Sequence, residues 1–232
     1  MNKSLLGASL FALALAAPAV HAHEAGDILV RAGAITVNPK ADSSTVKVDQ
    51  GPLAGANLGG KATMSSDTQL GLNFAYMLTN HVGIELLAAT PFEHDVKIKN
   101  TALGAANGKL GTLKHLPPTL SVVYYPLDSK SPFQPYVGGG INYTWIYDEH
   151  VGSEASANGF SNFKAKNSWG LAWQVGADYM LTDNIMLNAQ VRYIDIDTRA
   201  TVENNAVAPG TRARVNVDVD PFIYMVGLGY KF

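Results

Sequence analysis

Apolar and polar residues alternate with a period of two along most of this chain. Between residues 169 and 181, bulky side chains such as Trp169 and Trp173 alternate with small or polar ones such as Gln174. The same alternation returns near the end of the chain, in residues 222–232. Because successive side chains of a β-strand point to opposite faces, the pattern predicts strands with one bulky apolar face and one small, polar face.

Eight strands follow from this alternation, and their connections fall into two kinds. The strands are predicted near residues 27–38, 68–78, 82–93, 112–126, 133–148, 169–181, 185–198 and 222–232. Three connections are short, at 79–81, 126–132 and 182–184, and four are long and polar, at 39–66, 93–111, 149–165 and 199–213. Short and long connections alternate strictly, which is typical of an up-and-down barrel with both chain ends on the periplasmic side.

The bulky face is predicted to contact lipid. In a soluble β-sandwich or a lipocalin-like barrel the apolar face points inward, but an eight-stranded interior is too narrow for so many large side chains. Aromatic residues also gather near the predicted strand ends, as in the girdles of membrane barrels: Tyr124, Tyr179, Tyr230 and Phe232 at one end, and Trp145, Tyr147 and Trp169 at the other. The predicted fold is therefore all-β, an eight-stranded antiparallel up-and-down transmembrane β-barrel.

The first 22 residues have the pattern of a secretory signal peptide. Lys3 precedes a short apolar run, and Val20 and Ala22 occupy the −3 and −1 positions of a cleavage site after Ala22. The run is short for a helical membrane anchor. We therefore expect a signal peptide at 1–22 and a mature barrel at 23–232, in the outer membrane of a Gram-negative bacterium.

Composition narrows the range of partners. The chain of 232 residues has a formal net charge of −2 and contains no cysteine. This charge balance does not suggest a nucleic-acid partner. The expected partners are outer-membrane lipid, small hydrophobic or amphipathic solutes, and the outer-membrane assembly machinery, which is expected to recognise the C-terminal Phe232.

The inward face of the predicted barrel changes character along its axis. In the periplasmic half we expect an interior polar cluster that includes Arg31, Glu85, Gln174 and Asp178. Buried charges of this kind should pair with one another. In the other half we expect an apolar funnel formed by Ile35, Val37, Leu113, Ile194, Ile196, Val215, Val217 and Val219. This apolar region is either a solute-binding cavity open to the exterior or an ordinary packed core.

Prolines occur at similar heights in two neighbouring predicted strands. Pro91 lies in the third strand, and Pro117 and Pro118 lie in the fourth. Proline has no N–H to donate to a ladder and normally belongs at a sheet edge, which a closed barrel lacks. The two sites therefore predict a gap in the wall, and with it a lateral exit into lipid.

Motifs of catalysis or cofactor binding are not evident. Residues 55–61 approach a phosphate-binding loop, but Ala62 replaces the Ser or Thr that would hold Mg²⁺. The candidates for an enzyme at the barrel rim are His94, Asp95 and His150, and no spacing among them supports a catalytic or metal site. We therefore predict no catalytic residues, no metal and no cofactor, and a protein that is not an enzyme.

Several segments together resemble the OmpW family of outer-membrane proteins. These are HEAGDILVRAGAITVNPK, DTQLGLNFAYMLT, VGIELLAATPFEH, HLPPTL, PYVGGGINYT, WGLAWQVGADY, VRYIDIDTRA and the terminal GYKF. The resemblance implies a hydrophobic extracellular funnel that passes small solutes, with a lateral opening created by a proline that corresponds to Pro91. It also implies that Leu87 constricts the channel, and that Arg192 stands where some members carry a tryptophan that narrows it. The charge of Arg192 leaves room for small polar or amphipathic substrates.

The expected function is passive uptake of small hydrophobic or amphipathic molecules, with Leu87, Pro91, Pro117 and Arg192 as the channel and gate residues. Two alternatives stay open. The first is a structural or adhesive barrel whose loops at 39–66 and 149–165 bind partners, and the second is a channel for small polar solutes.

Overall fold

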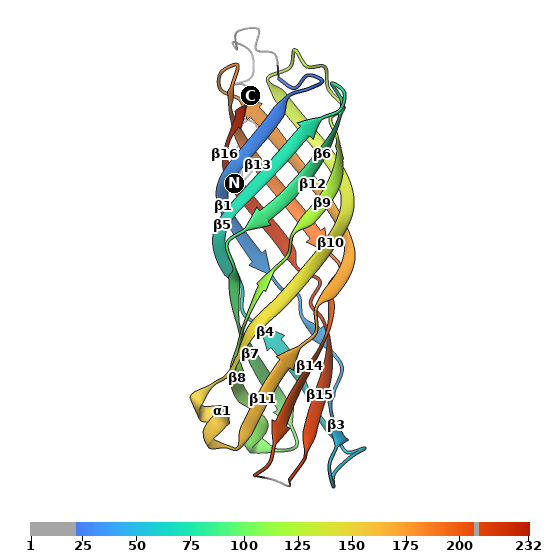
Figure 1. The fold of residues 1–232 in the computed structure, drawn as a ribbon, viewed down its shortest axis with the longest axis vertical. Helices are drawn as coiled ribbons and strands as arrows, with labels where there is room; N and C mark the ends of the chain where they lie inside the picture. The colour runs from blue at the N-terminus through green and yellow to red at the C-terminus, as the bar shows by residue number, and fades with distance from the viewer. Residues whose placement is uncertain (1–21, 207–208) are drawn as a thin grey trace, which may run out of the picture.

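The computed structural model describes residues 22–206 and 209–232, which form one elongated antiparallel β-barrel (Figure 1). Eight strands form a closed ring in the half that holds the C-terminus: β1 (Ile28–Asn38), β5 (Asp67–Met77), β6 (Val82–Ala89), β9 (Thr119–Tyr124), β10 (Phe133–Val151), β12 (Ser168–Met180), β13 (Ile185–Ile194) and β16 (Phe222–Lys231). Each pairs with its neighbours in this order, and β16 closes the ring on β1. The predicted fold class is confirmed.

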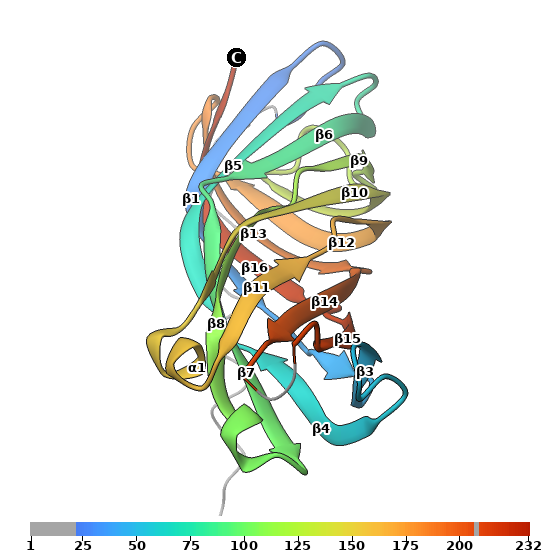
Figure 2. The same ribbon diagram turned by 60° about the horizontal axis from the view of Figure 1, so that its bottom comes forward.

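A second set of strands extends the barrel away from the chain ends, and we call this part the distal half (Figure 2). Its strands are β2 (Asp42–Ser43), β3 (Val46–Gln50), β4 (Asn57–Met64), β7 (Phe92–Thr101), β8 (Gly108–Leu116), β11 (Phe160–Ala165), β14 (Asp197–Asn204) and β15 (Arg212–Asp218). A short helix, α1 (Ser153–Ala157), and a 3-10 turn, η1 (Gly104–Ala106), lie at its far end. Strand β10 is long enough to belong to both halves.

The prediction of four long loops is wrong over much of their length. Residues 93–111 contain most of β7 and the start of β8, residues 39–66 contain β2, β3 and β4, residues 149–165 contain α1 and β11, and residues 199–213 contain most of β14. The physical reason is visible in β7, where Val96 and Ile98 are buried while Lys97 and Lys99 are exposed. Water surrounds the outside of the distal half, so alternate residues are charged and the overall polarity hides the strand pattern. The predicted signal peptide, 1–22, lies outside the described residues except for Ala22.

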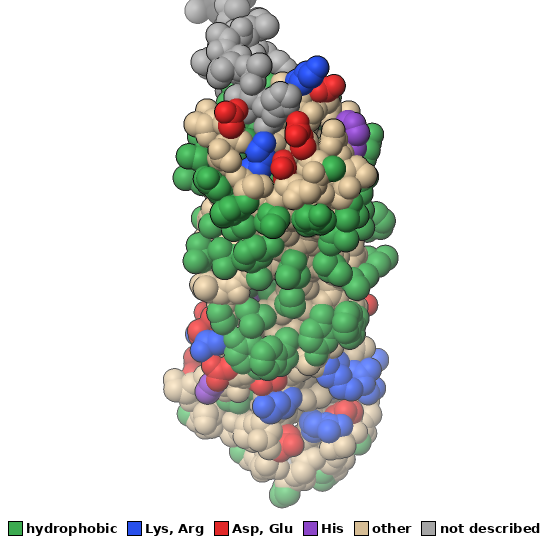
Figure 3. Space-filling view, turned by 45° about the horizontal axis from the view of Figure 1, so that its top comes forward, with side chains coloured by type: hydrophobic (Ala, Val, Ile, Leu, Met, Phe, Trp, Pro, Cys, Tyr) green, Lys and Arg blue, Asp and Glu red, His purple; other side chains and the backbone are tan. Residues whose placement is uncertain are grey.

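The outside of the ring is a belt of large apolar side chains. In β12, Trp169, Trp173 and Val175 are 72%, 61% and 57% exposed, whereas Gln174 between them is buried. Figure 3 shows this belt as a band of apolar side chains between two zones that carry the charged groups. Among the described residues, no helix has the length and hydropathy that a membrane crossing needs. The belt gives the ring the surface that a lipid environment requires.

Inside the barrel, three layers follow one another along the axis. The layer nearest the chain ends is apolar and contains Leu29, Met77, Val123, Met180 and Met186. Polar and charged side chains form the middle layer. The third layer is a long apolar core that starts at the level of Ile35, Leu87, Ala172, Ile194 and Met225 and continues into the distal half.

Arg31 is the centre of the middle layer, which we call the interior polar cluster. Its guanidinium donates from Nε to Asp178 at 3.0 Å, from Nη1 to Asn73 at 2.9 Å and from Nη2 to the Tyr125 hydroxyl at 2.8 Å. It also forms an ion pair with Glu85 at 3.4 Å. Strand register explains this convergence, because Arg31 lies directly opposite Asn73 on the inner face.

Arg192 completes the cluster from the neighbouring side of the barrel. Its Nη2 lies 2.6 Å from Glu85 and donates a short hydrogen bond to Gln174, which in turn donates to Glu85 at 2.8 Å. Arg31, Glu85, Asp178 and Arg192 are each 1% exposed or less. The middle of the barrel is thus filled by two guanidinium groups and two carboxylates that pair with one another.

Replacing Arg31 with Met is expected to destabilise the barrel by about 3–5 kcal/mol, because Asp178 would keep a buried charge without its main partner. The measurement is urea-induced unfolding of the refolded protein in phospholipid vesicles. Arg199→Met is the matched control, since the side chain of Arg199 is exposed on the outer wall, where its Nε donates to Asn216 at 3.1 Å. Equal stability of the two variants would contradict the central role of Arg31.

Candidate functional site

A cavity of about 230 Å³ opens at the far end of the distal half, and we call it the vestibule. Strands β3, β4, β7, β8, β11, β14 and β15 contribute to it. Its walls are mainly apolar and include Val46, Leu58, Ile98, Leu110, Phe160 and Phe163. These side chains are inward-facing members of strands whose outer faces are polar, so the alternation of the sequence creates the apolar chamber directly.

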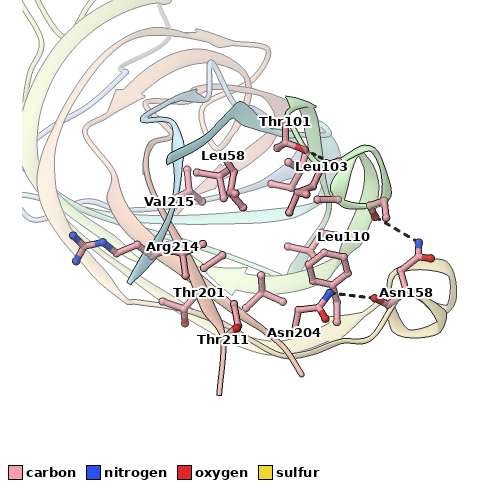
Figure 4. Close-up of a pocket in the computed structure, with 18 of the residues that line it drawn as sticks. Leu58, Thr101, Leu103, Leu110, Asn158, Thr201, Asn204, Thr211, Arg214 and Val215 are labelled. Carbon is pink, nitrogen blue, oxygen red and sulfur yellow. Dashed lines mark hydrogen bonds between the residues drawn. The ribbon is translucent and has the colours of Figure 1, made fainter. Parts of the chain in front are cut away.

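The rim of the vestibule is held by hydrogen bonds between separate segments (Figure 4). Asn158, just after α1, donates to the carbonyl oxygen of Ala105 at 3.5 Å, and Asn204 of β14 donates to the carbonyl oxygen of Asn158 at 3.1 Å. The hydroxyl of Thr101 donates to the carbonyl of Leu103 at 2.8 Å. In Figure 4 the guanidinium of Arg214 extends away from the cavity. The three hydrogen-bonding side chains thus connect the segments around the mouth, whereas the buried Thr211 hydroxyl, also in the lining, has no hydrogen-bond partner among the described residues.

A narrower cavity of about 30 Å³ lies between the vestibule and the ring, and we call it the neck. Most of its lining is apolar: Val37, Pro39, Met64, Leu113, Ile146, Ile196, Val219 and Pro221. The remaining four residues are His94, His115, Thr144 and Thr198. The neck is thus a mainly apolar cavity with four polar side chains in its wall.

The two histidines of the neck contact each other. Their Nε2 atoms are 2.7 Å apart and their rings are nearly parallel, with centroids separated by 4.8 Å. Phe92 stacks on His115 at 5.3 Å. Burial, which disfavours the charged imidazolium, lowers the pKa of His94, and burial together with the neighbouring His94 lowers the pKa of His115 to about 3. Both side chains are therefore neutral at neutral pH.

The wall beside the neck lacks ladder pairing over a short stretch, which we call the strand gap. Strands β6 and β9 pair as far as Leu87 opposite Thr119, and β7 and β8 resume with Phe92 opposite His115. Between these pairs, residues 88–91 and 116–118 face each other without a ladder bridge. Leu87 and Phe92, both buried, border the gap from inside.

The prolines explain why no bond crosses the gap. Pro91, Pro117 and Pro118 have no N–H, so neither side can donate a ladder hydrogen bond at these positions. The other backbone groups bond away from the gap. The N–H of Thr90 donates to Leu70 at 2.9 Å, and the carbonyl oxygen of Pro118 accepts from the N–H of Tyr143 at 3.1 Å.

Asn142 of β10 secures the other side of the gap. Its Nδ2 donates to the carbonyl oxygens of Pro117 and Pro118 at 3.0 and 3.1 Å and to the Thr119 hydroxyl at 3.0 Å. The fourth strand is therefore tied to β10, while the third is tied to β5. Sequence reasoning anticipated the prolines at this height but not Asn142, because its partners become visible only with the register of β9 and β10.

The predicted funnel residues and Arg192 lie inside the barrel. All eight predicted funnel residues are buried; Val37, Leu113, Ile196 and Val219 line the neck, Val215 lines the vestibule, and Ile35, Ile194 and Val217 belong to the packed core. The apolar half is thus a packed core that contains two cavities. Arg192, expected at a constriction, belongs to the interior polar cluster.

The three residues weighed for a rim enzyme do not converge. His94 faces inward and bonds to His115, whereas Asp95 faces outward and forms an ion pair with Lys109 at 2.7 Å. His150 is exposed and lies beside Asp148.

One group of carboxylates could offer ligand atoms to a cation. The oxygens of Asp195, Asp197 and Asp220 lie within 4.8 Å of one another on the outer wall beside the apolar belt. Burial and the neighbouring carboxylates Asp195 and Asp218 raise the pKa of Asp197. Asp195 and Asp197 lie just before and at the start of β14, whereas Asp220 lies between β15 and β16, so the sequence pattern did not single out the three as a cluster.

Known proteins share both the sequence and the fold. The model of the OmpW family matches residues 24–232. Outer membrane protein W of Vibrio cholerae serotype O1 is 42% identical over 232 residues, which cover all of both chains. The crystal structure of OprG from Pseudomonas aeruginosa has a TM-score of 0.84 at 47% identity, covering 92% of this chain and 99% of that chain. Outer membrane protein AlkL of Ectopseudomonas oleovorans is 30% identical over 186 residues, 78% of this chain and 75% of the relative.

These relatives carry the names of outer-membrane proteins and not of enzymes. They confirm the family resemblance that the sequence motifs indicated, and they confirm the predicted location in the outer membrane. Together with the closed ring and its apolar belt, the match shows that the chain belongs to the OmpW family of outer-membrane β-barrel proteins.

Proposed function

We propose that the protein is a passive channel for small hydrophobic or amphipathic molecules. Such a solute enters the vestibule from the cell exterior, passes the neck and leaves through the strand gap into the lipid. The observation that carries the proposal is the position of the gap: the wall lacks ladder pairing beside the neck and just above the closed interior polar cluster.

The vestibule supports an apolar solute. Thr101, Asn158 and Asn204 form hydrogen bonds at the rim, and the exposed side chains Leu53 and Leu103 extend the apolar surface to the mouth. A cavity with this lining stabilises an apolar ligand by removing its surface from water. Transfer from water through the barrel to lipid then lowers the free energy of the solute, so the transport needs no coupled energy source.

The interior polar cluster opposes a straight path to the periplasm. A solute moving along the axis would have to separate Arg31 and Arg192 from Asp178 and Glu85, which are fully buried and paired. Separating a buried ion pair leaves uncompensated charges in a medium of low dielectric, which is costly. An apolar solute offers no compensating hydrogen bonds, so the lateral route is favoured.

The strand gap offers that route at a small cost. Backbone hydrogen bonds of the third strand run to β5 at Thr90, and those of the fourth run to β10 through Asn142 and Tyr143. Widening the gap therefore breaks no ladder hydrogen bond between the two strands. What closes the gap is side-chain contact, including that of the buried Leu87 and Phe92.

Replacing Pro91 with Val is expected to slow the uptake of naphthalene by about fivefold, because Val restores an N–H and one added hydrogen bond of about 1 kcal/mol favours the closed wall. The measurement is uptake into proteoliposomes whose outer leaflet contains lipopolysaccharide. Pro126→Val, in an exposed turn next to β9, is the matched control.

Folding of both variants is checked by the shift of the unheated band on gels. Equal uptake by Pro91→Val and wild type would refute the lateral exit. A protein that binds partners through loops 39–66 or 149–165 and does not transport would show no uptake above empty vesicles, and a channel for small polar solutes would pass a small sugar in the same vesicles.

Replacing Ile98 with Asn is expected to raise the half-saturating concentration of naphthalene uptake by about tenfold, as expected when a hydrophobic pocket loses apolar contact. Ile98 is 7% exposed and lines the vestibule. The control is Ile98→Leu, which conserves the volume and apolar character of the side chain. Unchanged saturation in Ile98→Asn would exclude the vestibule from the route.

A further inference from the structure

The protons of the two neck histidines have fixed positions. His94 Nδ1 lies 2.6 Å from the carbonyl oxygen of Ser65, which can only accept, so Nδ1 carries the proton. The Nε2 atom of a neutral His94 is then bare, and His115 must donate to it from Nε2 across 2.7 Å. The low pKa of both side chains agrees with two neutral rings.

These hydrogen bonds leave His115 Nδ1 without a proton, as an acceptor with a free lone pair. The atom is buried and has no hydrogen-bond partner among the described residues. The side chain itself is 5% exposed and lines the neck. A buried acceptor without a partner is destabilising, and in native proteins it often marks a place where a water or ligand supplies the missing donor.

The hydroxyl groups of the two neck threonines, Thr144 and Thr198, already donate their protons in hydrogen bonds. Asn142 donates from Nδ2 to two proline carbonyls, which fixes the orientation of its amide, so Asn142 Oδ1 accepts from the Thr144 hydroxyl at 2.7 Å. The Thr198 hydroxyl donates to the carbonyl oxygen of Lys166 at 2.6 Å. The hydroxyl oxygens retain lone pairs, and no proton on the neck's described polar side chains is left for a solute.

We infer that the neck recognises a solute by a hydrogen-bond donor, the O–H of an alcohol or phenol or the N–H of an amine, with His115 Nδ1 as its acceptor. The inference rests on the proposed function for the route of the solute, and it narrows the substrate class. The neck volume of about 30 Å³ exceeds the roughly 10–15 Å³ that a water-sized group needs. A ring-sized remainder needs more room than this, so Leu113, Ile196 and Val219 must move apart to contact it.

The same arrangement selects against carboxylates. An anionic oxygen brought to the neck would meet the lone pairs of His115 Nδ1 and of the threonine hydroxyls and would find no donor among these side chains. A hydrocarbon of equal size would leave His115 Nδ1 unpaired. We therefore expect the order alcohol or phenol first, hydrocarbon second and carboxylate last.

Binding of phenol, toluene and benzoate to the refolded full chain in detergent micelles tests this order. The three probes share one ring and differ in a donor, a methyl group or a carboxylate. Phenol is expected to bind about fivefold more tightly than toluene, the effect of one neutral hydrogen bond, and benzoate most weakly. In protein labelled with ¹⁵N-histidine, phenol should shift the His115 Nδ1 resonance in the direction that marks an accepted hydrogen bond.

His115→Phe removes the acceptor and keeps a flat ring that can stack on Phe92, so it should bind phenol and toluene alike. His150→Phe, at an exposed histidine, is the matched control and should keep the preference. Should His115→Phe fail to fold, the ¹⁵N shift in the wild-type protein decides the question. Equal binding of phenol and toluene to the wild type, or an unmoved Nδ1 resonance, would overturn the inference.

The outcomes for recognition and for transport are distinguishable. If Pro91→Val slows uptake while phenol and toluene bind alike, the result supports the proposed channel and refutes recognition of a hydrogen-bond donor by His115. If phenol binds preferentially while Pro91→Val leaves uptake unchanged, donor recognition stands and the lateral exit fails.

Discussion

The need to pair every backbone N–H and C=O in lipid is the constraint on which this structure depends. It requires that β16 close on β1, and it leaves the eight-stranded ring with no edge. The strand gap is the exception, and it occurs where Pro91, Pro117 and Pro118 have no N–H to satisfy. The remaining carbonyls there bond to Asn142 and Tyr143, so the wall is interrupted without leaving these groups unpaired.

Closure at eight strands also fixes what the interior can hold. The ring is too narrow for an aqueous pore, so side chains fill it, and their character changes along the axis. Paired charges around Arg31 fill the middle, whereas apolar side chains fill the distal half except in the vestibule and the neck. The boundary between these layers coincides with the strand gap, where Leu87 lies just above Glu85 on the same inner face.

The sequence predicted the ring well because lipid imposes a strong alternation, as in β12, where Trp169 and Trp173 are exposed and Gln174 is buried. The inward residues Leu113, Val215 and Val217 of the distal half were predicted, but much of the length of its strands was assigned to loops, because exposed residues such as Lys97 and Lys99 alternate with the buried Val96 and Ile98. The histidine contact could not be predicted, because it depends on the pairing of Phe92 with His115 in the β7–β8 ladder, whose register shifts between Val96 and Lys97. The sequence placed Arg31, Glu85, Gln174 and Asp178 in one layer, but which of their atoms bond to one another depends on the register between strands.

The balance of charge in the interior polar cluster has an electrical consequence. Two guanidinium groups face two carboxylates, so the formal charges of Arg31, Arg192, Glu85 and Asp178 cancel within one layer. A voltage across the membrane therefore exerts little net force on this layer. On the proposed lateral route, a neutral solute would leave the barrel without crossing this charged layer and without moving charge across the membrane.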